Sequence, residues 1–371
     1  MADLRIYNRS NIHQLNWPKN EDGYLGKNYL LPFILEGTDS FISNAKTTLY
    51  LLHLDDCIIP ISVNETEYDN SYILSSYFLV TNLKEKIHNT YGWEKIRNKI
   101  SIFLLDPLLK WIKINKVVII NNWLLTTNPY PDLTKKQIEI LTNFLKKQFP
   151  DHYLMFRSLN IYKNTNVFEA LQRANYRMIP TRNIYLYDPQ QTEKLNSNII
   201  RKQRRDISKI SQSHYSIETP NVLSDKEVSR ILELYHHLYI SRYTKYSPLY
   251  TKKYLHHMLE KKILRFKLLK KEGEIYAVAG FLKKNGYLLT PFLGYDRSLP
   301  QKEGLYQMIS GIIMEEIKKE QLIAHQGSGA SDFKKWRGYI EQEEYIAIHD
   351  SHLSSYRRLF WFLGERFAPK F

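Results

Sequence analysis

One loop in the second half of the sequence decides how the chain is interpreted. It reads Gly294-Tyr295-Asp296-Arg297-Ser298-Leu299-Pro300-Gln301-Lys302-Glu303-Gly304-Leu305-Tyr306. Strand-like residues precede this loop, and a long amphipathic run, 304–320, follows it. A glycine where a loop enters a helix leaves backbone N–H groups and the positive end of the helix dipole open to an anion. The loop therefore predicts a pyrophosphate site formed by Gln301, Lys302, Glu303, Gly304 and Leu305.

The segments on both sides of the loop predict an ordered series of helices and strands. Before it, three strand-like runs form an antiparallel meander, because Asn285-Gly286 is a strong hairpin signal between the last two. Ser224, with Glu227 three residues later, is typical of a helix start. The expected helices are 198–211, 224–242, 251–261, 304–320 and 331–339, and the expected strands are 214–219, 264–270, 275–283, 287–293, 322–325 and 344–349.

The first half repeats the later part of this order in weaker form. Its expected strands are 116–125, 153–157 and 176–187, and its expected helices are 134–149 and 167–174. At 371 residues the chain exceeds what one hydrophobic core usually supports. A mixed α/β fold with two tandem domains, 1–190 and 191–371, is therefore expected, and the second domain would end in a helix.

The distribution of charge points to the second half as the working half. The chain carries a net charge of +15, of which +4 lies in residues 1–190 and +11 in residues 191–371. Ten of the fourteen glycines also lie in the second half. Nucleic acid, an anionic membrane surface and a phosphate-bearing small molecule all fit such an excess of positive charge, and net charge does not choose among them.

The same sequence excludes several classes of protein. A single cysteine, Cys57, forms neither an internal disulfide nor a thiolate metal cluster. The pairs His236-His237 and His256-His257 point apart on a helix, so no metal site is expected. The start lacks the apolar core of a signal peptide, and no stretch approaches 18 apolar residues. We expect a cytoplasmic protein without an integral membrane segment.

Three motifs in this order resemble the GCN5-related N-acetyltransferase (GNAT) superfamily, in particular its FemAB-like and BioF2-like tandem branch. Gln301-x-x-Gly304 stands where that family has its acyl-CoA loop, although Tyr306 replaces the final small residue. The basic stretch 198–209 is similar to the helix that opens the branch's catalytic domain. Residues 331–338, Ser-Asp-Phe-Lys-Lys-Trp-Arg-Gly, resemble the branch's Asp-x-x-Tyr-Lys-x-x-Phe-Gly helix. The resemblance covers most of 195–350 by motif and 115–187 by element order.

The resemblance implies an N-acyltransferase that moves an acyl group from acyl-CoA to the amine of a small-molecule acceptor by direct attack. An alternative within the same branch uses aminoacyl-tRNA as the donor. A third hypothesis is a non-catalytic binder of nucleic acid or anionic lipid on a decayed transferase fold. The first-half loop 126–132 holds two prolines and no glycine, so one donor site is expected, in the second half.

Direct acyl transfer requires a deprotonated amine, donors for the oxyanion and a proton for the leaving group. We expect polar residues with these roles near the donor site. The candidates for proton transfer are Asp332, Tyr306, His325 and Tyr295. The candidates for substrate binding are Lys334, Arg337, Asp296 and Arg201.

Overall fold

The computed structural model describes residues 4–367, apart from the side chains of residues 192–194. It shows a mixed α/β fold, as predicted, with a mixed sheet of twelve strands. The chain divides into two compact units, of which the first comprises Met1–Thr181, Thr244–Tyr250 and Tyr345–Phe371. The second comprises Arg182–Tyr243 and Thr251–Glu344. Residues 1–3 and 368–371 of the expected domains lie outside the described residues.

Unit 1 holds strands in the order β1-β2-β3-β4-β5-β12, of which only β4 and β5 are parallel. Its strands are β1 (Leu4–Tyr7), β2 (Thr48–Leu54), β3 (Cys57–Asn64), β4 (Val117–Ile120), β5 (Tyr153–Leu159) and the second half of β12 (Ile340–His349). Its helices are α1 (Glu21–Leu25), α2 (Leu31–Glu36), α3 (Phe78–Lys86), α4 (Gly92–Trp111), α5 (Lys135–Gln148), α6 (Ile161–Arg173) and α12 (Ser355–Phe367).

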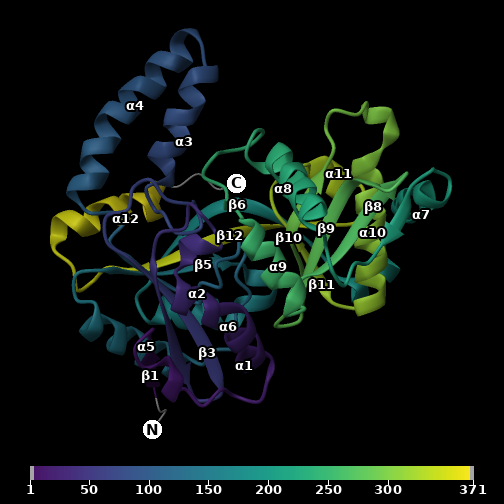
Figure 1. The fold of residues 1–371 in the computed structure, drawn as a ribbon. Helices are drawn as coiled ribbons and strands as arrows, with labels where there is room; N and C mark the ends of the chain where they lie inside the picture. Colours follow the sequence, from purple (N-terminus) through teal and green to yellow (C-terminus); the bar gives the residue numbers. More distant parts are fainter. Residues whose placement is uncertain (1–3, 368–371) are drawn as a thin grey trace. The chain divides into compact units, whose positions relative to one another are not determined.

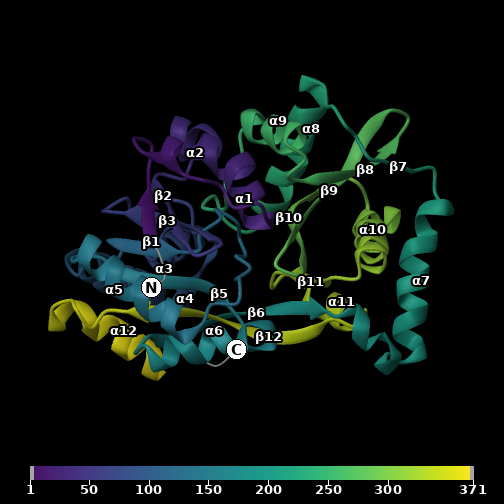
Figure 2. The ribbon, with the colours of Figure 1, turned by 90° about the horizontal axis from the view of Figure 1, so that it is seen from below.

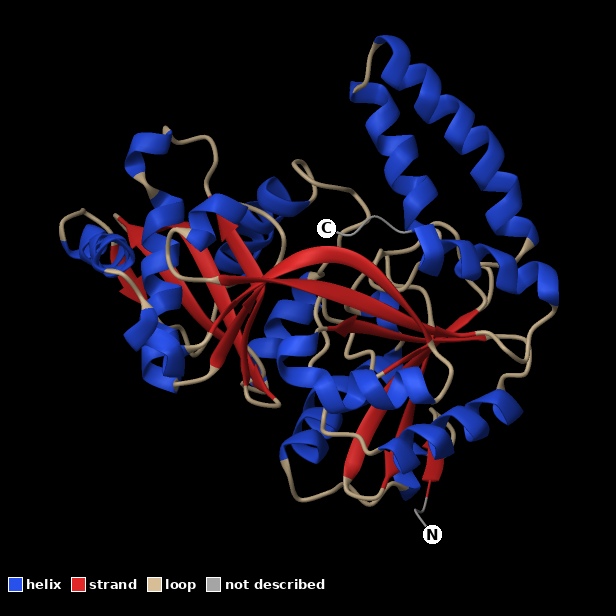
Figure 3. Ribbon diagram, turned by 180° about the vertical axis from the view of Figure 1, so that it is seen from behind, coloured by secondary structure: helices blue, strands red, loops and turns tan. Residues whose placement is uncertain are grey.

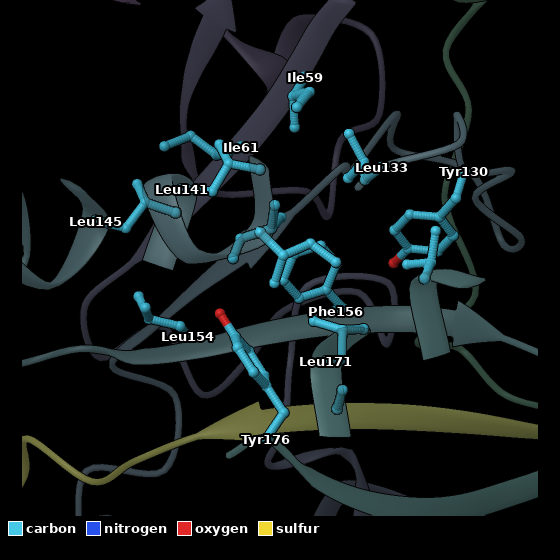
Figure 4. Close-up of a cluster of buried hydrophobic side chains, with 14 of the residues drawn as sticks. Ile59, Ile61, Tyr130, Leu133, Leu141, Leu145, Leu154, Phe156, Leu171 and Tyr176 are labelled. Atoms are coloured by element: carbon cyan, nitrogen blue, oxygen red, sulfur yellow. The ribbon is translucent and has the colours of Figure 1, made fainter. Parts of the chain in front are cut away.

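Two apolar layers stabilise unit 1. Helices α5 and α6 cover one face of the sheet, where Leu141, Leu145 and Leu171 pack around Phe156 and Tyr176 (Figure 4). The other face packs against the base of α4 and against α12 through residues such as Trp361. Because β3 and β4 are covered on both faces, nearly all their side chains are buried.

A helical hairpin extends from unit 1. Figures 1 and 3 show α3 and α4 running side by side away from the strands of this unit. At the base of the hairpin the Asp106 carboxylate accepts hydrogen bonds from the Tyr77 hydroxyl, at 2.5 Å, and from Lys84, and it pairs with Lys110 at 2.6 Å. These contacts fix α3 against α4 where the hairpin leaves the unit.

Unit 2 holds the strands in the order β6-β11-β10-β9-β8-β7. Its strands are β6 (Arg177–Tyr187), which begins in unit 1, β7 (Ser216–Glu218), β8 (Arg265–Lys271), β9 (Glu274–Lys284), β10 (Tyr287–Tyr295) and β11 (Ile323–Gln326). Its helices are α7 (Ser197–Ser211), α8 (Asp225–Tyr239), α9 (Lys252–Glu260), α10 (Leu305–Glu320) and α11 (Ser331–Lys335). Strands β8, β9 and β10 form the predicted antiparallel meander.

Helix α10 is the centre of unit 2. Its apolar side chains pack on the sheet, and α7 lies against its other side, as Figure 2 shows. The two helices approach so closely at Gly311 that a Cβ there would lie 2.6 Å from the backbone oxygen of Asp206. The glycine thus lets α7 hold a fixed position over the start of α10.

The compact units differ from the expected domain ranges in two ways. The division falls inside β6, at 181/182, because this strand runs on where the sequence predicts a boundary at 190/191. The final strand and helix, expected in the second domain, belong largely to unit 1, because β12 pairs with β5 from Tyr345 onward. Within residues 4–367, no helix is both long and apolar enough to cross a bilayer.

Candidate functional site

The predicted phosphate loop is a tight turn that starts α10. Residues Gln301–Glu303 form a single 3-10 turn, and Gly304 follows it in the left-handed conformation, with φ of 70°. A Cβ on Gly304 would lie 2.0 Å from Cε of Lys209, which reaches over the turn from α7. The start of α10 has no side-chain cap, so its first N–H groups are directed at the same region as the Lys209 ammonium group.

A basic pocket of about 370 Å³ lies beside this turn. Lys209, Lys271 and Lys302 line it, with Glu303 as its one acidic residue. Neither Lys209 nor Lys302 has an ion-pair partner among residues 4–367. Three lysines beside an uncapped helix start make this pocket suited to bind an anion.

Strands β10 and β11 separate next to the turn. Their parallel pairing covers only Tyr287–Leu289 against Ile323–His325, although β10 continues to Tyr295. Just past the last pair, the Gln326 amide donates to the Thr290 hydroxyl at 3.2 Å. The later part of β10 therefore has no strand partner on the side of β11, and its backbone groups on that edge are open to a ligand.

A narrow cavity of about 20 Å³ lies behind this opening. Its walls come from β10, α10, β11 and α11 and include Tyr306, Gln326, Phe333 and Lys334. The Tyr306 ring lies 5.7 Å from the Tyr295 ring and 4.6 Å from the Phe333 ring. The cavity holds about one water molecule, so a larger ligand group would have to displace a wall side chain.

Tyr306 and Lys334 have unusual acid–base properties in this cavity. Burial, reinforced by Tyr295, raises the pKa of Tyr306 well above its usual value, so the hydroxyl keeps its proton at neutral pH. Burial, with a smaller effect from the nearby Arg182, lowers the pKa of Lys334 to about 7. The Lys334 ammonium group donates to the backbone oxygens of Gly327, at 2.5 Å, and Gly329. A neutral amine satisfies these two acceptors and keeps a lone pair available.

The lowered pKa of Lys334 predicts a pH-dependent stability. Its unfolded-state pKa is about 10.4, so between about pH 7 and pH 10.4 the unfolded chain holds more protons and stability rises with pH. The cost of burying the charge is complete below about pH 7. Lys334→Met should therefore stabilise the protein most at low pH, and its advantage should shrink by up to about 1.4 kcal/mol per pH unit across that window.

Urea unfolding of both proteins between about pH 6 and pH 10 measures this difference. The neighbouring Lys335 is exposed and paired with Glu341, so Lys335→Met is the matched control and should leave the slope nearly unchanged. Parallel curves for wild type and Lys334→Met would show that Lys334 titrates as an ordinary lysine.

Arg337 and Arg201 occupy different environments from each other. The Arg337 guanidinium is buried, makes a two-pronged pair with Asp206 on α7, with 3.0 Å between Nη2 and Oδ1, and lies over the Phe333 ring. It lines the cavity, but its charge is already neutralised by this carboxylate. Arg201 is exposed on the outer face of α7 together with Arg204 and Arg205. Arg337 thus stabilises the wall of the cavity, whereas Arg201 lies on the exposed surface of α7.

Two further candidates lie apart from the cavity. His325 is buried, and burial lowers its pKa to about 4, so it is neutral at physiological pH. Its neighbour Gln326 lines the cavity, and successive strand residues face opposite sides, so His325 points to the other face of the sheet. Asp332, at the first turn of α11, is exposed and is not among the cavity residues.

Asp296 stabilises the loop itself. Its carboxylate accepts hydrogen bonds from the backbone and hydroxyl of Ser298, at 2.9 and 2.6 Å, and pairs with Arg230 at 2.5 Å. Burial would raise the pKa of Asp296, but these donors outweigh it and lower the pKa. Asp296 therefore holds the start of the loop in shape, and the half-buried Tyr295 beside it supports the Tyr306 ring.

The structure adds Lys209, Gln326 and Phe333 to the site. Lys209 is the last residue of the basic stretch 198–209, which the sequence identifies only as a helix. Gln326 follows directly after a predicted strand. No local signal marks either as a site residue, because both act through contacts between distant segments.

The corresponding loop of unit 1 is filled by its own side chains. The buried Asn121 and Asn128 bond to the Trp123 indole and backbone at 2.9 and 3.0 Å, and Asn121 also donates to the Pro129 oxygen. The following helix, α5, begins with a capping box between Thr134 and Gln137, so its start is not open like that of α10. This supports the expectation of a single donor site.

With the geometry in place, the fold can be compared with known proteins. No family model and no curated protein sequence matches the chain. Among solved structures, L-PGS from Bacillus licheniformis matches with a TM-score of 0.47 and 11 % identity, covering 68 % of this chain and 83 % of that one. FemX matches with a TM-score of 0.46 and 8 % identity, covering 67 % and 83 %.

A tandem GNAT protein from the clavulanic acid biosynthesis pathway matches with a TM-score of 0.43 and 7 % identity, covering 96 % of this chain and all of that one. The chain is thus similar in fold to L-PGS, to FemX and to this tandem GNAT protein.

Proposed function

We propose that the protein is an N-acyltransferase that takes an acyl group from acyl-CoA and transfers it to the amine of a small-molecule acceptor. The observation that carries the proposal is the left-handed Gly304 at the uncapped start of α10, with the Lys209 ammonium group above it. Gln301 to Leu305 would bind the pyrophosphate. The basic pocket of Lys209, Lys271 and Lys302 would bind the remaining phosphate of the donor.

Two side chains of the cavity have the protonation states that acyl transfer needs. Neutral Lys334 would accept a proton from the attacking amine, which forms the new C–N bond at the acyl carbon. Tyr306, protonated at neutral pH, would donate its proton to the sulfur as the C–S bond breaks. Transfer of a proton from Lys334 back to Tyr306 restores both groups. The open edge of β10 would supply backbone donors to the oxyanion.

Release of free thiol tests this proposal. The protein is incubated with a panel of acyl-CoAs and primary amines, and thiol is measured with and without each amine. Amine-dependent release supports an acyltransferase. No amine-dependent release with any pair of acyl-CoA and amine would contradict the proposal.

A second donor, aminoacyl-tRNA, is favoured by the outer face of α7. Arg201, Arg204 and Arg205 are exposed there, and Lys202 lies 4.8 Å from the centre of the Trp336 ring. A small donor bound at Gly304 does not require these three arginines. An RNA backbone would use them as phosphate contacts, with Trp336 as a surface for base stacking.

Replacing the three arginines by alanine tests this second donor. If tRNA binds, affinity should fall with salt, and the slope of log K against log[salt] should decrease by about 0.7–0.9 for each RNA phosphate that no longer pairs with an arginine. Mobility-shift titration at several salt concentrations measures the slope. The same three substitutions should leave acyl-CoA binding unchanged, and no tRNA shift at low salt would remove this donor.

A further inference from the structure

Helix α4 presents an exposed apolar face that the acyltransfer site does not use. Trp93 is 79 % exposed and Phe103 is 78 % exposed, values that are unusual for such large apolar side chains. Ile96, Ile100, Leu104 and Trp111 are exposed on the same side. At 100° per residue these six fall within about 100° of arc, along a helix about 30 Å long.

Polar and buried positions lie elsewhere on the helix. Asn98 and Leu109 point to the opposite side and are buried. The exposed face therefore results from the helical period and not from a helix that is apolar all round. Single exposed apolar residues are ordinary, but a continuous face of this length is typical of a contact surface.

The apolar face continues onto α12. The Trp111 ring packs on the Tyr356 ring with centroids 4.6 Å apart, where the base of α4 meets the C-terminal helix (Figure 1). Helix α12 buries Arg357 and Trp361 in unit 1, while Leu359 and Leu363 stay exposed on its outer side. Both elements belong to unit 1, so this is one surface of one unit.

Positive charges border the apolar face of α4 on both edges. Lys99 lies on one edge and Arg97 on the other, and neither has an ion-pair partner within residues 4–367. Lys84 and Lys110, by contrast, are bound to Asp106. Apolar and aromatic residues flanked by unpaired cations match the boundary between the acyl chains and headgroups of an anionic bilayer.

We propose that α4, extended by α12, is an interfacial helix that binds the surface of an anionic membrane without crossing it. Trp93, Phe103 and Trp111 enter the headgroup region, and Arg97 and Lys99 contact lipid phosphates. A second copy of the chain fits the face less well, since it would bring the same cationic edges and an equal net charge of +15. The inference is independent of the proposed acyl transfer.

Vesicle co-sedimentation of the full chain tests the proposal. The wild type should sediment with vesicles that contain phosphatidylglycerol and much less with pure phosphatidylcholine. Trp93→Ser/Phe103→Ser should weaken binding by more than about tenfold. Arg97→Gln/Lys99→Gln should weaken it by about 30-fold, and only the phosphatidylglycerol-dependent part of the binding should disappear. All four side chains lie outside the buried core, so these variants should fold normally.

Val222→Ser is the matched control, because Val222 is 83 % exposed and lies in unit 2. It should bind vesicles like the wild type. Analytical ultracentrifugation of the same proteins shows whether the apolar face instead binds a second copy of the chain. Failure of the wild type to bind anionic vesicles, or equal binding by Trp93→Ser/Phe103→Ser, would overturn the proposal. A dimer that this double variant dissociates, without vesicle binding, would assign the face to a second copy.

Discussion

Gly304→Glu is expected to lower amine-dependent thiol release by at least about a hundredfold, equivalent to roughly 2.7 kcal/mol of transition-state stabilisation. Gly304 has φ of 70°, which costs a residue with a Cβ about 1 kcal/mol. A Cβ there would also force Lys209 away from the start of α10. The new carboxylate would then occupy the place proposed for the pyrophosphate and repel it.

Two further variants separate these effects. Gly304→Ala introduces the same backbone strain as Gly304→Glu and displaces the flexible Lys209 side chain, but it adds no carboxylate. We therefore expect a smaller loss of thiol release, of about tenfold. Gly92→Ala is the matched control, because Gly92 also has positive φ, of 55°, but a Cβ there would meet nothing within 4 Å. Turnover that survives Gly304→Glu would show that this loop does not bind the donor.

Breaking the Asp206–Arg337 pair is expected to cause a large loss of stability in unit 2. Both side chains are buried, at 2 % and 5 % exposure, so removing one leaves the other charge uncompensated. Such losses are typically about 3–5 kcal/mol. We expect Asp206→Asn to lower the free energy of unfolding of unit 2 by this amount. The measurements are urea unfolding and hydrogen exchange of α7.

A paired replacement checks the cause. Asp206→Leu/Arg337→Met removes both charges together and should recover most of the lost stability. Lys226→Met breaks the exposed pair with Glu274 and should change stability by less than about 1 kcal/mol. If Asp206→Asn changes the free energy of unfolding as little as Lys226→Met does, the Asp206–Arg337 pair does not hold α7 to the segment after α11.

The sequence predicts the local structure of unit 2 well. Ser224 and Glu227 form the predicted capping box of α8, and Asn285-Gly286 joins β9 to β10. These features depend on residues close together in the chain, which a sequence shows directly. Helix α11 is shorter than predicted, ending at Lys335, and β12 starts earlier, at Ile340, because Gly338, with φ of 86°, breaks the helix.

Most of the first 115 residues of unit 1 could not be predicted in the same way. Strand β3 is buried on both faces, so it lacks the alternation that identifies a strand, and it contains Pro60. Helix α4 has the apolar pattern of a core helix, although the structure leaves that face exposed. Local pattern does not say what covers a face.

The candidate site shows the same division. The turn at Gln301–Gly304 follows from the sequence, whereas its cover by Lys209 and the lowered pKa of Lys334 depend on packing between α7, α10 and α11. Arg337 illustrates the limit from the other side. In the sequence, Arg337 lies three residues after Lys334, which favours a substrate-binding role. In the structure, its guanidinium pairs with Asp206 instead.

Calorimetric titration with acetyl-CoA tests the central claim most directly. The turn at Gly304 and the basic pocket predict one binding site per chain, with affinity that falls as salt concentration rises. Binding should be lost in Gly304→Glu and kept in Gly92→Ala. Absence of any heat of binding by the folded wild type, or equal binding by Gly304→Glu, would contradict the account.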